Sequence, residues 1–229
     1  MFLPWVGLFE QVRLADVFVH YDDVQLPQGR SFMARVQIKA AGGVTWLTAP
    51  IDRARSGKLI NEVVLFGEAD WRAKHLKTLR HAYAHAPHFR QMFELAESIY
   101  AHPSDNLAEF NAAAVERAAE WLGLSPQFMR SSRMGVGGAS TQRLIDLCKA
   151  TESDVYVTGH GARRYLDHER FEAEGIAVRY MDYRKVPYPQ GHGEFTPFVS
   201  VLDAIANCGE RTRDLICSSA VDWRDFNGG

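Results

Sequence analysis

The apolar residues in the first third of the chain follow two patterns, one with helical spacing and one that alternates as in a strand. Apolar positions three and four residues apart predict a short helix over 6–14. β-branched and aromatic residues then alternate over 16–21, which predicts a strand. The runs 35–39 and 44–48 flank a glycine pair and predict a β-hairpin, and a further short strand is expected at 62–66.

The middle of the chain follows a helical pattern throughout. Apolar side chains recur at helical spacing from residue 70 to about residue 86, where a proline interrupts the run. The spans 89–100 and 106–122 are two further amphipathic patterns. The sequence therefore predicts a helical insertion at about 69–123.

The last third alternates between short apolar runs and helical stripes. Strands are expected at 128–130, 155–157 and 176–180, with helices from 140 and over 162–174. Strands and helices that alternate at these lengths are typical of parallel crossovers. The expected class is α/β, with a mostly parallel sheet sandwiched by helices, in a single domain over 1–229.

Composition narrows the function classes. The 229 residues are 46% hydrophobic and 24% charged, which is typical of a globular protein, and the formal charge of −2 gives no basic surface for nucleic acid. No apolar run is long enough to span a bilayer, and no signal peptide is recognised. Cys148, Cys208 and Cys217 show no metal-type spacing. We therefore expect a cytoplasmic protein with reduced thiols, no metal and no cysteine nucleophile.

Motifs in matching order along nearly the whole chain resemble the WbqC-like family of bacterial proteins. They are Phe2-Leu-Pro-Trp-Val-Gly-Leu-Phe9, Asp16 to Gln25, Arg35 to Lys39, Trp46-Leu-Thr-Ala-Pro50, Trp71 with His75, Tyr83 with Ala86-Pro87, Ser131-Ser132, Thr158-Gly159, Tyr165-Leu-Asp167, Pro187-Tyr-Pro-Gln190, Ser200 to Asp203 and Asn207-Cys-Gly209.

The resemblance also raises an expectation about the N-terminal strand. Family members usually begin a few residues earlier, with a strand and a Gln-Pro before the Phe-Leu-Pro-Trp element. We therefore expect the strand at Val17–Val19 to be central, with an empty position beside it that upstream residues would fill. Ala34 stands where members often have Asn, so a hydrogen bond from that amide is absent.

The family setting implies a transferase. Such proteins resemble products of surface-polysaccharide and natural-product gene clusters, which implies amide formation by acyl or aminoacyl transfer to an amine of an amino sugar or amino acid. An activated donor, such as a thioester on an acyl carrier protein, would make other cofactors unnecessary. The implied function is compatible with an oligomer. The alternatives are a nucleotide-dependent ligase or nucleotidyl-transfer relative, and a non-catalytic scaffold of a biosynthetic complex.

Three residues are the catalytic candidates. Asp22 and Asp23 end a strand, where α/β proteins place their sites, and only one of two adjacent carboxylates reaches a given cleft. One of them would hold and orient a substrate ammonium, act as a base or, with help from His20 or Gln25, bind a divalent metal. Alternatively, both carboxylates serve only in a turn. His75 lies on an apolar helical stripe and is the candidate general base, or else a buried hydrogen-bonding residue.

Other residues are candidates for binding substrate. Arg30 and Arg35 flank a loop of small and polar residues, and a guanidinium binds carboxylate or phosphate in two-pronged fashion unless it serves a surface salt bridge. The glycines of 135–138 precede a helix and favour a capped loop over a phosphate cradle. The remaining candidates lie in the last third of the chain: Ser131, Ser132, Thr158, Gly159, His160, Tyr165 and Asp167.

Overall fold

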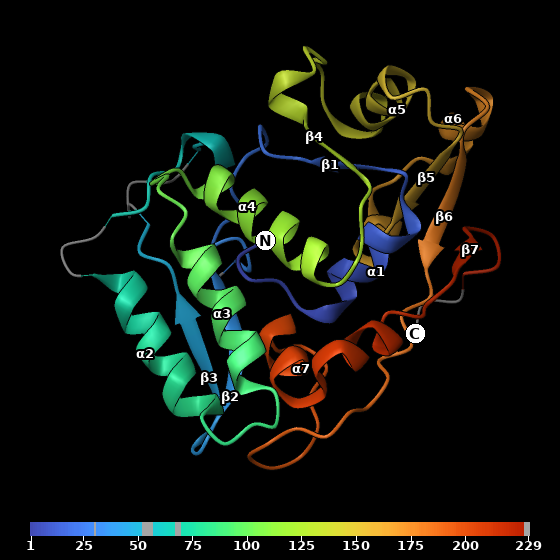
Figure 1. Ribbon diagram of the computed structural model, residues 1–229. Coiled ribbons are helices and arrows are strands. Elements are labelled where there is room, and N and C mark those ends of the chain that lie inside the picture. Colours follow the sequence, from blue (N-terminus) through green and yellow to red (C-terminus); the bar gives the residue numbers. More distant parts are fainter. Residues whose placement is uncertain (30, 52–56, 67–69, 227–229) are drawn as a thin grey trace. The chain divides into compact units, whose positions relative to one another are not determined.

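The structure is a computed structural model that describes residues 1–29, 31–51, 57–66 and 70–226 (Figure 1). The chain divides into two compact units, each built from three separate segments. The first unit contains 1–9, 22–125 and 185–216, and the second contains 10–21, 126–184 and 217–229. The helix α1 (Val6–Leu14) runs from the first unit into the second. The expectation of one domain stays a prediction.

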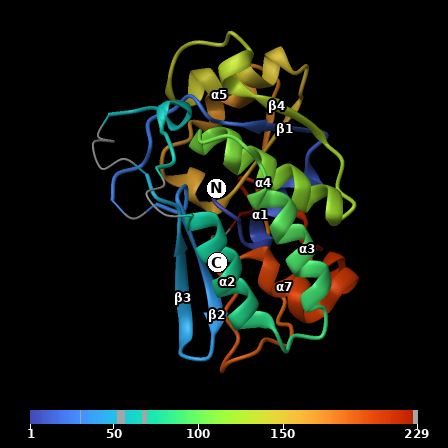
Figure 2. The same ribbon diagram turned by 60° about the vertical axis from the view of Figure 1, so that its left-hand side comes forward.

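The first unit combines a β-hairpin with helices. The strands β2 (Arg35–Ala40) and β3 (Gly43–Thr48) pair antiparallel, as the sequence predicted. Gly43 has φ +100°, which a side chain would strain. Figure 2 shows α2 alongside the hairpin. The helices of this unit are α2 (Trp71–Tyr83), α3 (Phe89–Tyr100), α4 (Leu107–Trp121) and α7 (Val201–Cys208).

A buried carboxylate anchors a long irregular segment within the first unit. Asp203 is 0% exposed and accepts hydrogen bonds from the hydroxyls of Tyr83 and Tyr188, each at 2.9 Å. Lys39 is also buried, and its ammonium donates to the carbonyl of Glu194. Burial raises the pKa of Asp203, while the two tyrosines and Lys39 act to lower it. These bonds hold residues 188–194 against α2, α7 and β2.

The second unit is the α/β part of the molecule. β1 (Val17–His20) pairs parallel with β4 (Gln127–Arg130), and β5 (Val155–Thr158) pairs parallel with β6 (Ala177–Met181). β7 (Ala220–Asp222) is antiparallel to β6. The helices are α5 (Ser140–Ala150) and α6 (His168–Ala173), and the core beneath them contains Ile145, Phe171, Val178 and Tyr180.

The α/β class, the hairpin and the helical middle are confirmed, and some details differ. The described strands form three small sheets instead of one mostly parallel sheet. The strand predicted at 62–66 is wrong, because Ile60–Glu62 is a 3₁₀ turn and the following residues make only isolated bridges. The helix predicted over 162–174 is interrupted after a 3₁₀ turn, and α6 starts where Asp167 caps it. No helix among the described residues is long and apolar enough to cross a bilayer.

Candidate functional site

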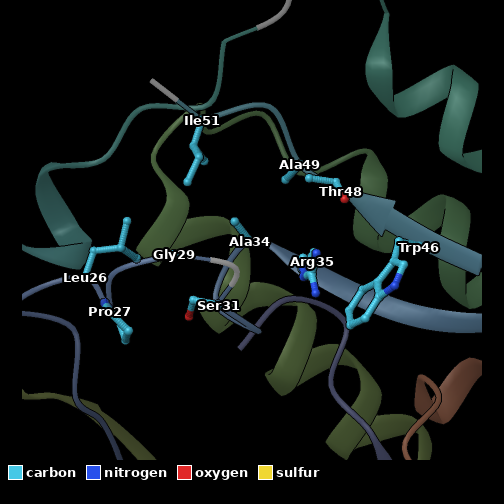
Figure 3. A pocket seen from close by; sticks show the side chains of 10 residues that line it. All are labelled: Leu26, Pro27, Gly29, Ser31, Ala34, Arg35, Trp46, Thr48, Ala49 and Ile51. Atoms are coloured by element: carbon cyan, nitrogen blue, oxygen red, sulfur yellow. The ribbon is translucent and has the colours of Figure 1, made fainter. Parts of the chain in front are cut away.

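A pocket in the first unit opens beside the hairpin (Figure 3). Its volume is about 440 Å³, which is within the range of small-molecule sites. Most of its wall is apolar, and the polar side chains are few. The lining residues are Leu26, Pro27, Gly29, Ser31, Ala34, Arg35, Trp46, Thr48, Ala49 and Ile51.

Arg35 provides the charge of this pocket. Its guanidinium carbon lies 3.6 Å from the ring centre of Trp46, a close cation–π contact. The Nε atom of Arg35 is buried and has no hydrogen-bond partner among the described residues. A buried donor without a partner costs free energy that an anionic ligand would recover. The arrangement therefore suits a carboxylate or phosphate.

The hairpin register explains why these side chains meet. Arg35 is opposite Thr48, and Gln37 is opposite Trp46, so the tryptophan lies diagonally across from the arginine. Phe32 extends the aromatic surface, with its ring centre 5.9 Å from that of Trp46. Trp46 was not among the predicted site residues, although an aromatic residue two positions from the hairpin partner of an arginine indicates such a contact.

The predicted carboxylates lie on the segment that leads into the pocket. This segment runs antiparallel to residues 58–61, and the carbonyl of Asp22 accepts a hydrogen bond from the Asn61 amide at 2.9 Å. Asp22 is buried, Asp23 is half-buried and Gln25 is exposed. Leu26, the next residue, lines the pocket wall. Arg30 lies outside the described residues.

His75 lies in an aromatic environment within the first unit. Its Nδ1 atom is 2.9 Å from the Tyr100 hydroxyl, and Phe2 and Trp71 present ring edges to it. The imidazole also hydrogen-bonds the backbone of Thr48. His75 is not among the residues that line the pocket beside the hairpin. These contacts favour the second of the two roles predicted for His75, a buried hydrogen-bonding residue, which here positions β3. The general-base role stays the alternative prediction.

The pH dependence of stability tests the environment of His75. Burial lowers its pKa from 6.5 to about 4, and the Thr48 bond opposes part of that change. The folded chain thus binds this proton more weakly than the unfolded chain, so its stabilisation is complete above pH 6.5 and is lost as the pH falls toward 4. The loss amounts to about 3 kcal/mol.

We expect His75→Gln to remove this pH-dependent loss of stability, as measured by urea unfolding at pH values between 7 and 4. Glutamine retains a polar contact but does not titrate, so the variant should melt lower at pH 7 and keep its turnover per folded molecule. A variant that melts normally but loses about 10²–10⁴-fold in kcat would instead establish His75 as the base.

The predicted binding residues of the last third lie in the second unit, after β4 and β5. Ser131 is buried and its hydroxyl donates to the carbonyl of His20 at 3.3 Å, whereas Ser132 is exposed. The Asp167 carboxylate accepts from the Arg170 amide and caps α6. Tyr165 is 66% exposed. Their contacts with a substrate stay predictions.

The glycine and histidine that follow β5 have structural partners. A Cβ on Gly159 would lie 2.9 Å from the Gln11 Nε2 atom, so a larger residue there would require the end of the Gln11 side chain to shift. His160 donates from Nε2 to the carbonyl of Met181 at 2.7 Å. Thr158 is buried and its hydroxyl bonds the hydroxyl of Tyr156.

Comparison with known proteins identifies a family to which the chain is similar. The model of the WbqC-like protein family matches residues 1–215. A Mycobacterium tuberculosis protein, "Uncharacterized protein Rv1507c", is 31% identical over 218 residues, which covers 94% of each chain. No solved structure matches.

Proposed function

The chain belongs to the WbqC-like protein family, and we propose that it is a transferase that forms an amide by acyl or aminoacyl transfer to an amine. The amine would belong to an amino sugar or amino acid in surface-polysaccharide or natural-product assembly. The donor would be an activated acyl group such as a carrier-protein thioester. The cytosol is the proposed compartment.

One structural observation supports the proposal. Arg35 is stacked on Trp46 and lines a mostly apolar pocket of about 440 Å³, and its buried Nε atom has no hydrogen-bond partner in the described part of the chain. Such a pocket recognises a small molecule with one anionic group. An amine substrate that also carries a phosphate or carboxylate meets this description.

The proposed reaction needs only proton transfer and orientation. The amine nitrogen attacks the carbonyl carbon of the thioester, a carbon–nitrogen bond forms, and the carbon–sulfur bond breaks to release the thiol. The proton lost by the nitrogen passes to a carboxylate and then to the departing sulfur. We assign this proton transfer to Asp23, because it is half-buried while Asp22 is buried.

Removal of the guanidinium tests the proposal. In Arg35→Ala, we expect the Kd for glucosamine 6-phosphate, measured by calorimetry, to rise about 10–100-fold, because a charge-assisted contact contributes about 1.5–3 kcal/mol. Glucosamine, which lacks the phosphate, should bind the native chain and the variant equally weakly. The melting temperature should fall only slightly, because the substitution removes the cation–π contact with Trp46 but no hydrogen bond from Nε to any described residue.

Arg90→Ala is the matched control. Arg90 is exposed and pairs with Glu94 on the same helix at 2.8 Å, so its loss should leave the Kd unchanged. Equal Kd values in the native chain and Arg35→Ala would remove the anion-binding role on which the proposal depends.

A further inference from the structure

The helix α2 differs from the other helices in its charge. Its 13 residues contain four cations, Arg72, Lys74, Lys77 and Arg80, and no Asp or Glu. Each of the other α-helices among the described residues contains at least one acidic residue. The whole chain has a formal charge of −2, so a helix with only positive charges does not follow from the composition.

Three of these cations form one exposed surface. Lys74, Lys77 and Arg80 are exposed and recur at a spacing of three residues. Side chains at this spacing are neighbours on the surface of a helix. The buried side of α2 contains Leu79 and Tyr83, which pack into the first unit. The three exposed cations are called the basic face of α2 below.

The two lysines of the basic face are not neutralised within the protein. Arg72, at the start of the helix, pairs with Asp105 at 3.3 Å. In the described part of the chain, no carboxylate lies within ion-pair distance of Lys74 or Lys77. Like charges three residues apart repel each other, and cations near the N-terminus of a helix oppose its dipole. The basic face thus destabilises the free protein, which points to a role outside the fold.

The two lysines lie toward the pocket end of the hairpin. His75, next to Lys74 in the chain, hydrogen-bonds the backbone of Thr48, which lines the pocket. The other end of α2 lies toward the hairpin turn, where the Lys39 amide donates to the Tyr83 hydroxyl at 3.2 Å. The helix therefore runs along the hairpin (Figure 2), and its N-terminal part is nearer to the pocket.

We infer that the basic face of α2 docks an acidic helix of the acyl carrier protein that delivers the thioester. Complementary charges steer association and fix the orientation of two protein surfaces. A carrier bound at this face would have its flexible arm close to the pocket in which Arg35 holds the amine. The inference rests on the proposed transferase function and names its partner.

Two other anionic partners fit this face less well. A helix that lies on a membrane buries large apolar side chains in the lipid, but Ala73 is the only apolar residue among the exposed positions of α2. Binding to nucleic acid depends on many phosphate contacts, which one helix of a chain with a formal charge of −2 does not provide. An acidic protein surface of the size of one helix matches the basic face.

Charge reversal tests the inference. The donor is the acetylated acyl carrier protein of bacterial fatty-acid synthesis, a small acidic protein. In Lys74→Glu/Lys77→Glu, we expect kcat/KM for this donor to fall about 10–100-fold, because the reversed charges repel the carrier. Acetyl-pantetheine, which has no protein surface and no charge, should react equally with the native chain and the variant. The variant should fold, since glutamate is a strong helix former that suits the N-terminal part of a helix.

Arg90→Glu/Arg211→Glu is the matched control. Both arginines are exposed and lie in the first unit outside α2, and their reversal changes the net charge by the same amount. This variant should keep the native kcat/KM for the acetylated carrier. A loss equal to that of the lysine variant would mean that net charge attracts the carrier, and would overturn the inference.

The two proposals fail separately, because binding is measured apart from turnover. Fluorescence anisotropy of the labelled carrier gives its Kd for the native chain and for the lysine variant. A higher Kd in the variant, with no amide product from any amine, would overturn the transferase and leave the docking face. Equal kcat/KM values for the acetylated carrier would overturn the docking face and leave the transferase. The inference is also overturned if phosphatidylglycerol vesicles or a DNA duplex bind through the two lysines and the carrier does not.

Discussion

Asp23→Asn is expected to fold normally and to lose about 10²–10⁴-fold in kcat, the usual contribution of a general base. The substitution preserves the size of the side chain and its ability to accept a hydrogen bond, but an amide does not take up the proton of an attacking amine. The rate of amide formation under saturating substrate measures the effect, and the melting temperature establishes that the variant folds.

Asp22→Asn is the neighbouring control. Asp22 is 6% exposed, so a change to its buried carboxylate should change stability more than turnover. A normal kcat in Asp23→Asn would contradict the assignment, and a kcat loss confined to Asp22→Asn would transfer the role to Asp22.

Asp203→Ala is expected to cause the largest loss of stability, about 3–5 kcal/mol. The substitution leaves the hydroxyls of Tyr83 and Tyr188 without their acceptor and Lys39 without its nearby negative charge. For a chain of this length, a loss of that size lowers the melting temperature by roughly 10 °C. Calorimetry of the native chain and the variant measures it.

Asp214→Ala provides the reference for this measurement. Asp214 is exposed and pairs only loosely with Arg211, at 3.8 Å, so its removal should change the melting temperature by less than about 2 °C. If Asp203→Ala melted as high as Asp214→Ala, the buried cluster would not be what holds residues 188–194 to the first unit.

Local patterns predicted the helices well because each helix carries its own signal. The apolar stripe of α3 buries Met92, Leu95, Ala96 and Ile99, at the spacing that the sequence shows. The strand at 62–66 failed for the opposite reason. Its apolar residues pair through isolated bridges that depend on distant segments, and no local pattern contains that information.

The candidate site could be predicted only in part. Arg35 was identified because an arginine beside a polar loop suggests an anion site, and the structure places it in a pocket. Its contact with Trp46 depends on the hairpin register, which composition does not reveal. The burial of His75 was expected from its stripe, but the bonds to Tyr100 and Thr48 required tertiary structure.

The central claim is amide formation from a thioester and an amine that carries an anionic group. The most direct measurement incubates the purified chain with acetyl-coenzyme A and glucosamine 6-phosphate, alongside other phosphorylated or carboxylated amines, and follows the products by mass spectrometry. We predict an N-acylated product and free thiol in equal amounts, formed by the native chain and strongly reduced with Arg35→Ala. Thioester loss no faster than without protein, across the acyl donors and amines tested, would contradict the claim.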